Sequence, residues 1–338
     1  MYPSTNYRSL LGKDYYFIDL RTPMEYEKAT IPGAYSLPIL TNEEYRHIST
    51  LYDRGQVEEA KKKGVELVSY KLPEIFSTIL EKTKEKKVVL FCARGGYRST
   101  VLFTLCRALH VDILKLDYGY KGYRQVILEE LPKLVDRCTF INLNGLTGTG
   151  KTEILQELKS MGQVLDLEEL ANHRGSLLGG LGKGPQPGQK MFESLIFEKL
   201  LSFEEPTVFV ESESSKIGNL YVPQVLYKKY KESPHQIKIR SSREKRIQRI
   251  HQDYLPQEDE AKRKEALACV RSMERYINPK KLQHLLERLE QGEVDWVIGE
   301  LMEKYYDKSY SIGKGNMERV YDNEDSKETA LKIGMDYL

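Results

Sequence analysis

Residues 139–152 read TFINLNGLTGTGKT, and this stretch decides the fold of the second half of the chain. Its apolar first part is typical of a buried strand, and a helix-like stretch follows the glycines. The pattern G-x-x-x-x-G-K-T is that of a phosphate-binding loop (P-loop), in which backbone N–H groups surround a phosphate. We therefore predict a phosphate site at Gly145, Gly148, Thr149, Gly150, Lys151 and Thr152.

A second loop lies upstream, between the strand-like run KKVVLF (86–91) and the helix-like stretch STVLFTLCRAL (99–109). It reads CARGGYR and begins at Cys92, which we predict to be a nucleophile. The loop N–H groups, the N-terminus of the following helix and two arginines all favour an anion and a thiolate. The predicted anion-binding residues are Arg94, Gly95, Gly96, Arg98 and Ser99.

Strand-like and helix-like segments alternate in both halves of the chain. This alternation predicts an α/β protein with two parallel sheets and helices packed on their faces. We place the first domain at residues 1–135, the P-loop domain at 136–255, and a helical extension packed on it at 256–338, whose last part looks irregular. The glycine-rich segment 175–189 is expected to be a functional loop.

The composition is that of an ordinary globular protein, with 40% hydrophobic and 30% charged residues among 338. No apolar run approaches the length of a membrane span, and no signal peptide is recognisable, so we expect a cytoplasmic protein without membrane contact. The four cysteines show no metal-ligand spacing, and neither a disulfide framework nor a zinc site is indicated.

Further polar residues follow the strands of the second half. A nucleotide hydrolase usually places an aspartate beside its P-loop to hold Mg²⁺, whereas here the strand-like run TVFVESES (207–214) carries Glu211 and Glu213. A Mg²⁺ ion bound through Thr152 stays an open alternative. The phrase His-Arg-Gly-Ser fits either acid–base and phosphate-contacting work or a capped turn. The candidate residues of this site are Asp166, His173, Arg174, Glu211 and Glu213.

A basic stretch, 237–254, is the candidate nucleic-acid contact. The net charge of +2 is too small to attract nucleic acid through the overall field, so a local patch would be needed. A solvated helix face is the alternative reading. The candidate residues are Lys238, Arg240, Arg243, Arg246 and Arg249.

The order of these motifs resembles a known family. The Cys92 loop, with IDLRTPMEY (18–26) and IPGA (31–34), resembles the rhodanese domain over about residues 5–130. A rhodanese domain followed by GLTGTGKT, LANHRGSLLGGLG (170–182), QPGQKMFE (186–193), VESESSKIG (210–218) and YYDKSY (305–310) resembles the tRNA 2-selenouridine synthase family. The chain departs from the expected pattern at Ser215 and Lys308.

The resemblance implies a two-step transferase acting on 2-thiouridine at the tRNA wobble position. Geranyl diphosphate, held by the P-loop, would geranylate the sulfur, with Leu177 and Leu178 beside the prenyl chain. Selenium from selenophosphate, accepted or relayed by Cys92, would then replace the geranylthiol. No tightly bound cofactor is implied, and an enzyme that makes selenophosphate is a possible partner.

Three alternatives stay open at this point. The chain could be a small-molecule kinase or ATPase whose cysteine domain is regulatory, which Mg²⁺-stimulated ATP turnover would reveal. It could instead be a non-catalytic sulfur carrier, which would form a Cys92 persulfide but no modified nucleoside. A phosphatase at Cys92 is a weaker alternative, because no general acid is evident nearby.

Overall fold

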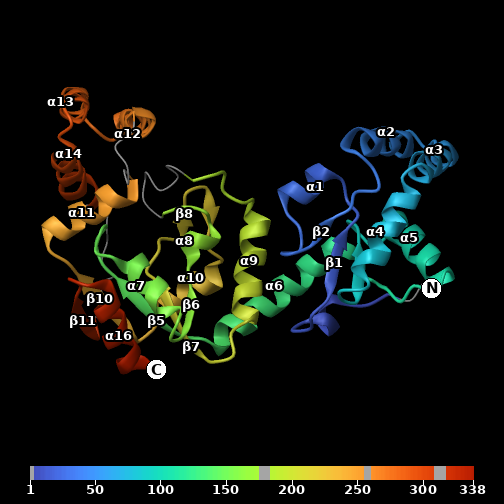
Figure 1. Ribbon diagram of the computed structural model, residues 1–338, viewed down its shortest axis with the longest axis horizontal. Helices are drawn as coiled ribbons and strands as arrows, with labels where there is room; N and C mark the ends of the chain where they lie inside the picture. Colours follow the sequence, from blue (N-terminus) through green and yellow to red (C-terminus); the bar gives the residue numbers. More distant parts are fainter. Residues whose placement is uncertain (1–3, 175–182, 255–259, 308–316) are drawn as a thin grey trace. The chain divides into compact units, whose positions relative to one another are not determined.

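The computed structural model describes residues 4–174, 183–254, 260–307 and 317–338. The chain divides into two compact units, each considered separately. Unit 1 comprises Met1–Lys133 and Pro187–Ser202, and unit 2 comprises Leu134–Gln186 and Phe203–Leu338. Each unit combines a parallel sheet with helices (Figure 1), which confirms the predicted α/β class.

Unit 1 is built on a sheet with the strand order β2-β1-β3-β4, in which all neighbours are parallel. All four residues of β3 are buried, as expected for an inner parallel strand. Asp19 of β1 pairs in register with Phe91 of β3, so both strands end at the same edge, where the cysteine loop begins. The strands are β1 (Tyr16–Asp19), β2 (Tyr35–Ser36), β3 (Val88–Phe91) and β4 (Leu114–Lys115).

The helices of unit 1 enclose a core that contains Ile18, Ile79, Leu90 and Phe103. Helix α1 begins with a capping box at Thr22, whose hydroxyl accepts a hydrogen bond from the Glu25 N–H. The helices are η1 (Tyr7–Leu10), α1 (Pro23–Lys28), α2 (Asn42–Asp53), α3 (Val57–Ser69), α4 (Leu72–Lys82), α5 (Tyr97–Ala108) and α6 (Gly119–Arg137).

Asp19 and Arg21, from the IDLRT stretch (18–22), form a buried ion pair at the carboxyl edge of this sheet. The Arg21 guanidinium donates to Asp19 through Nε at 3.0 Å and through NH2 at 2.6 Å, and Thr30 donates to the same carboxylate at 2.8 Å. Arg21 also stacks on Tyr120, with 4.1 Å between its Cζ and the ring centroid. Because every charge has a close partner, the pair can be buried without a large penalty.

Helix α9 (Gln189–Leu201) is grouped with unit 1, although the sequence-based boundary includes it in the P-loop domain. Glu198 accepts hydrogen bonds from the hydroxyls of Tyr7 at 2.7 Å and Tyr123 at 3.3 Å. Burial raises the pKa of this carboxyl. Arg124 donates to Ser194 at 3.1 Å. These contacts bind α9 to the N-terminal and α6 regions of unit 1.

Unit 2 contains a five-stranded sheet with the order β11-β10-β5-β7-β6, again with all neighbours parallel. Strand β5, which leads into the P-loop, lies at its centre, and five of its six residues are buried. The strands are β5 (Thr139–Asn144), β6 (Gln163–Leu165), β7 (Thr207–Glu211), β10 (Gln236–Arg240) and β11 (Arg319–Asp322).

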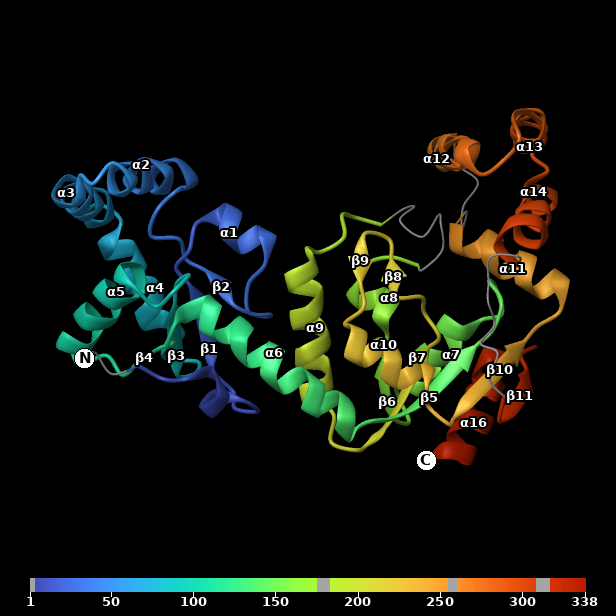
Figure 2. The same cartoon turned by 180° about the vertical axis from the view of Figure 1, so that it is seen from behind.

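Alternate side chains of β5 face different helices. Ile141 and Leu143 share a core with α7 and α16, whereas Phe140 meets Tyr230 of α10 edge to face, with ring centroids 6.5 Å apart. Helices therefore cover both faces of this sheet, as Figure 2 also shows. The elements are α7 (Lys151–Leu158), α8 (Leu167–Leu170), α10 (Gln224–Lys231), α16 (Ser326–Tyr337) and the antiparallel pair β8 (Lys216–Ile217) and β9 (Leu220–Tyr221).

The C-terminal part is helical as predicted between residues 260 and 306, but it also contributes strand β11 to the edge of the sheet. We call residues 260–307 the helical arm. The arm has its own small core, which includes Val270, Leu285, Leu289 and Val297. Its helices, with the preceding α11, are α11 (Arg243–Tyr254), α12 (Glu260–Ser272), η2 (Met273–Arg275), α13 (Pro279–Glu290), α14 (Val294–Leu301) and the π-helical turn η3 (Met302–Tyr306).

Candidate active sites

The P-loop connects β5 to α7 and contains two glycines in the left-handed region, Gly148 with φ 77° and Gly150 with φ 84°. Glycine adopts this conformation without steric cost. Lys151 is the first residue of α7, and its Nζ donates to the backbone oxygen of Gly145 at 2.9 Å. The lysine therefore folds back on the loop, where it can meet an incoming phosphate.

A cavity of about 440 Å³ opens beside this loop, within the range of about 300–1,000 Å³ that is usual for small-molecule sites. It brings together seven of the residues predicted for this site: Gly148, Gly150, Lys151, Thr152, Asp166, Arg174 and Glu211. Basic and acidic side chains both line it, so the cavity offers donors to an anion and carboxylates to a cation that accompanies it. The remaining lining residues are Thr147, Glu153, Gln156, Glu168, Glu169, Asn172, Lys183, Arg249 and Ile250.

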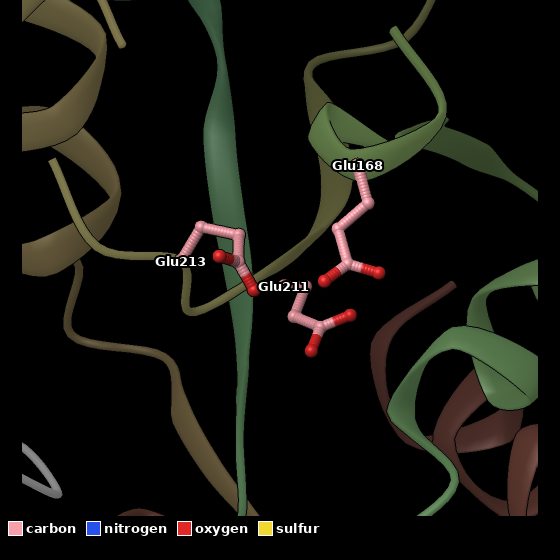
Figure 3. Close-up of side chains that lie close together, drawn as sticks. All are labelled: Glu168, Glu211 and Glu213. Atoms are coloured by element: carbon pink, nitrogen blue, oxygen red, sulfur yellow. The ribbon is translucent and has the colours of Figure 1, made fainter. Parts of the chain in front are cut away.

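Three buried glutamates converge beside the P-loop cavity (Figure 3), and one of them, Glu211, is paired with Lys151. Glu168 comes from α8, Glu211 ends β7, and Glu213 follows two residues later; each offers a carboxylate oxygen within 4.8 Å of the others. Burial, followed by the charges of Glu211 and Glu213, raises the pKa of Glu168. Burial, followed by the charge of Glu211, raises the pKa of Glu213. The cluster therefore favours bound protons or a bound cation.

The donor set beside the P-loop fits a divalent cation. Thr152 Oγ1 donates to Glu211 Oε2 at 3.3 Å, and Glu211 Oε1 lies 3.3 Å from Lys151 Nζ. Hydroxyl and carboxylate oxygens are the hard ligands that Mg²⁺ prefers. Thr152 and Glu211 are thus the residues that would hold such an ion.

The cysteine loop begins directly after β3. Cys92 is buried, and its Sγ lies 3.2 Å from Ser99 Oγ at the start of α5. Gly95 has φ 65°, and its backbone oxygen accepts a hydrogen bond from Lys115 Nζ at 3.0 Å. Gly96 precedes α5 as its N-cap residue, so the N-terminus of this helix faces the loop. Of the predicted loop residues, the structure therefore places Ser99 and Gly96 beside the thiol.

The two arginines of this loop differ in their surroundings. Arg98 pairs with Glu25 of α1, with NH1–Oε2 and NH2–Oε1 distances of 2.6 and 3.2 Å, whereas Arg94 is exposed. Burial raises the pKa of Glu25, but the hydrogen bond and charge of Arg98 outweigh this effect and leave the pKa below its ordinary value. Part of the Arg98 charge is thus balanced by Glu25 before any anion binds.

Two family models match the chain: a rhodanese-like domain over residues 5–126, and the tRNA 2-selenouridine synthase AAA domain over residues 138–333. A tRNA 2-selenouridine synthase of Pseudomonas fluorescens is 33% identical over 74% of this chain and 69% of its own length. The protein of that name from Pseudomonas putida is 30% identical over 91% of both chains, and that from Nitrosomonas eutropha is 32% identical over 73% of this chain and 65% of its own length.

The chain belongs to the tRNA 2-selenouridine synthase family. This membership confirms the resemblance inferred from the motif order, and with it a transferase of the class that modifies tRNA. Of the two departures from the expected pattern, Ser215 is exposed, and its backbone oxygen accepts a hydrogen bond from the Val222 N–H at 3.0 Å. Leu177, Leu178 and Lys308 lie outside the described residues. Among the residues that the structure describes, no helix has the length and apolarity needed to cross a membrane.

The segment after β6, which contains Asp166 and His173, has a structural role as well as lying at the candidate site. Asp166 caps α8 by accepting from the Glu169 N–H at 2.9 Å, and it also accepts from Gln156 at 2.9 Å. His173 is buried, its Nδ1 has no hydrogen-bond partner among the described residues, and burial, followed by the charge of Lys183, lowers its pKa. A neutral His173 next to the glycine-rich segment is therefore the protonation state that this site favours.

The basic stretch 237–254 divides into buried and exposed members. Arg246 and Arg249 are buried. Arg246 donates to the backbone oxygen of Thr147 in the P-loop, and Arg249 donates to Glu153 in the first turn of α7. The geometry therefore does not favour the predicted tRNA contact for these two arginines. Arg240 and Arg243 are exposed and pair with Asp322 and Glu303, respectively, and Lys238 is half-buried on β10. The tRNA contact stays a prediction for Lys238, Arg240 and Arg243.

Sequence reasoning missed Glu168 and the supporting role of α11. Glu168 follows the short strand β6 within VLDLEEL, and only the pairing of β6 with β7 places it next to Glu211. Its signal in the sequence was weak because an acidic residue in the first turn of a helix is common for electrostatic reasons alone.

Proposed function

We propose that this chain converts 2-thiouridine at the wobble position of tRNA to 2-selenouridine through an S-geranyl intermediate, using geranyl diphosphate and selenophosphate. Membership of the family supports tRNA selenation as the overall reaction. The observation that carries the finer proposal is the presence of two anion sites of different chemistry in one chain. One is the P-loop cavity with Lys151, and the other is the thiol loop with Cys92.

The P-loop cavity is the proposed site of geranylation. The thiouridine sulfur attacks the carbon of geranyl diphosphate that carries the bridging oxygen, so that a C–S bond forms and the C–O bond breaks. The diphosphate leaves with the bonding electron pair, and the N3 proton of the base is released to water. Loop N–H groups and Lys151 stabilise the charge of the departing diphosphate, which is the stage at which preorganised donors contribute most. No nucleotide hydrolysis is required.

Mg²⁺ would strengthen this leaving-group stabilisation if it binds with the substrate. Thr152 and Glu211 would hold the ion, and the chemistry that it supplies is neutralisation of diphosphate charge. The protein's own contribution is to fix these two side chains at the first turn of α7 and the end of β7.

The cysteine loop is the proposed site of selenium delivery. The five residues between Cys92 and Arg98 match the loop length of cysteine phosphatases, so the loop suits a tetrahedral anion such as selenophosphate. In the overall step a C2–Se bond replaces the C2–S bond, geranylthiol leaves with a proton, and hydrolysis of the P–Se bond yields phosphate. Ser99 Oγ lies 3.2 Å from Cys92 Sγ, so that its hydroxyl is placed to donate a hydrogen bond to the sulfur during the reaction.

Nucleoside mass spectrometry tests the proposal. Purified protein is incubated with 2-thiouridine tRNA and geranyl diphosphate, and selenophosphate is added afterwards. We expect geranylthiouridine first and selenouridine second. Unchanged thiouridine with active substrates, together with Mg²⁺-stimulated ATP turnover, would reject the proposal in favour of the kinase or ATPase reading.

A further inference from the structure

Helix α11 packs directly against the P-loop. A Cβ at Gly148 would lie 2.8 Å from the backbone oxygen of Arg246 and 3.0 Å from Ile250 Cδ1. A Cβ at Gly150 would lie 3.1 Å from Arg249 Cζ. Since Cβ atoms essentially never come within 3.0 Å of another heavy atom, the loop and α11 fit together only with glycine at position 148. At position 150 the closest atom is Asn323 Nδ2, at 2.4 Å, and the contact with Arg249 is tight.

Two outward-facing carbonyls of the P-loop are held by buried side chains. When the N–H groups of such a loop point at a phosphate, its carbonyls point away and need donors of their own. Arg246 Nε donates to the backbone oxygen of Thr147 at 2.8 Å, and Asn323 Nδ2 donates to that of Thr149 at 2.8 Å. Arg246 is 7% exposed and Asn323 is fully buried, so water cannot easily replace either donor.

The other side of the Arg246 guanidinium is occupied by the helical arm. Its NH1 and NH2 donate to the two carboxylate oxygens of Asp307 at 3.1 and 2.6 Å. Asp307 is the residue after η3, at the end of the arm. The planar fork of Arg246 places separate N–H donors against the Thr147 carbonyl and against both oxygens of Asp307. The donors of a lysine all sit on one nitrogen and cannot reproduce this spread.

We propose that Arg246 is a positioning residue of the P-loop and that the helical arm sets the loop's affinity for a diphosphate through Asp307. The inference rests on the proposed diphosphate site. Arg246 fixes the Thr147 carbonyl outward, which keeps the N–H groups of the loop directed at the ligand. Asp307 in turn fixes the guanidinium, so that a displacement of the arm releases the loop.

The test is the dissociation constant of inorganic pyrophosphate, measured by calorimetry on the full chain. Arg246→Lys should weaken binding by about tenfold, because one charge-assisted hydrogen bond is lost. Asp307→Asn should weaken it by about threefold, since the guanidinium keeps a neutral partner.

The matched control is Asp295→Asn: Asp295 also lies in the arm and pairs with α11, through His251 at 2.6 Å, but that pair does not include the P-loop. Because an exposed ion pair contributes little free energy, the dissociation constant of the control for pyrophosphate should stay within a factor of two of the wild-type value.

The double variant separates positioning from general stability. If Arg246 and Asp307 act as one unit, Arg246→Lys with Asp307→Asn binds pyrophosphate no more weakly than Arg246→Lys alone. A full product of the two single effects would overturn the coupling through the arm, and wild-type affinity in Arg246→Lys would overturn the positioning role. If Arg246→Lys fails to fold, Asp307→Asn against Asp295→Asn decides, and equal affinities of that pair reject the inference. Absence of pyrophosphate binding in the wild type would instead reject the proposed diphosphate site.

Discussion

Replacing Glu213 with glutamine should stabilise the protein at alkaline pH and flatten its dependence of stability on pH. Burial and the neighbouring Glu211 raise the pKa of Glu213 in the folded state above its ordinary value of 4.5. The folded state therefore binds the proton more tightly than the unfolded state. The stability contributed by this proton is complete below about pH 4.5 and is lost as the pH rises through the raised folded-state pKa.

The size of the effect follows from the spacing of the carboxylates. The carboxylate oxygens lie within 4.8 Å of one another, and two unit charges at that upper limit repel by about 3.5 kcal/mol at an effective dielectric constant of about 20. Attraction between Glu213 and Lys151 offsets part of this repulsion, as the direction of the lysine's effect on the pKa shows. We therefore expect Glu213→Gln to raise the free energy of unfolding at pH 8 by about 2 kcal/mol, with little change at pH 4.

Urea unfolding at pH 4, 6 and 8 in the presence of EDTA measures this difference without interference from a bound cation. Glu232→Gln is the control, since Glu232 is an exposed glutamate after α10. Parallel pH profiles for Glu213→Gln and the wild type, or destabilisation at pH 8, would refute the reasoning. Stabilisation accompanied by slower geranylation would mean that the cluster is retained for function at a cost in stability.

Three further outcomes are expected. Gly150→Ala should lower the free energy of unfolding by about 3 kcal/mol in urea titrations and abolish pyrophosphate binding, because its Cβ would lie 2.4 Å from Asn323 Nδ2 at a φ of 84°; full binding would contradict this. Glu25→Gln should destabilise the protein by about 1 kcal/mol at pH 7 and by less at pH 3, since Arg98 lowers the pKa of Glu25 and the stabilisation is lost as the pH falls through this lowered folded-state pKa; an equal loss at both pH values would argue against the ion pair. Arg243→Glu should weaken tRNA binding and reduce its salt dependence in filter-binding assays, whereas an unchanged salt slope would exclude this exposed residue from the interface.

The fold could largely be predicted because its decisive signals are local. The TFINLN and KKVVLF runs are buried central strands, and each is followed by a glycine-containing loop and a helix as expected. Strand β11 was missed because RVYD is short, and three of its four residues are exposed at a sheet edge. The grouping of α9 with unit 1 was missed because Glu198 finds its partner Tyr7 across 191 residues, which periodicity cannot reveal.

The candidate site was predictable where one motif supplies all its parts, and not where distant segments meet. The P-loop and the Cys92 loop are of the first kind. Arg246 is of the second kind: in the sequence it belongs to a basic stretch, but it contacts Thr147, 99 residues away, and loses its solvent exposure. Charge in a sequence indicates a solvated surface by default, because burial of an arginine requires partners that only the folded chain brings together.

The most direct test of the account separates the two reactions in variants of the same chain. Lys151→Met and Cys92→Ser are each given 2-thiouridine tRNA with geranyl diphosphate, and separately S-geranylated tRNA with selenophosphate; Cys106→Ser, which removes a buried thiol of α5, is the control. The account predicts that Lys151→Met fails only in geranylation, that Cys92→Ser fails only in selenation, and that the control performs both. Selenation by Cys92→Ser at the wild-type rate, or geranylation by Lys151→Met at the wild-type rate, would contradict the assignment of the two sites.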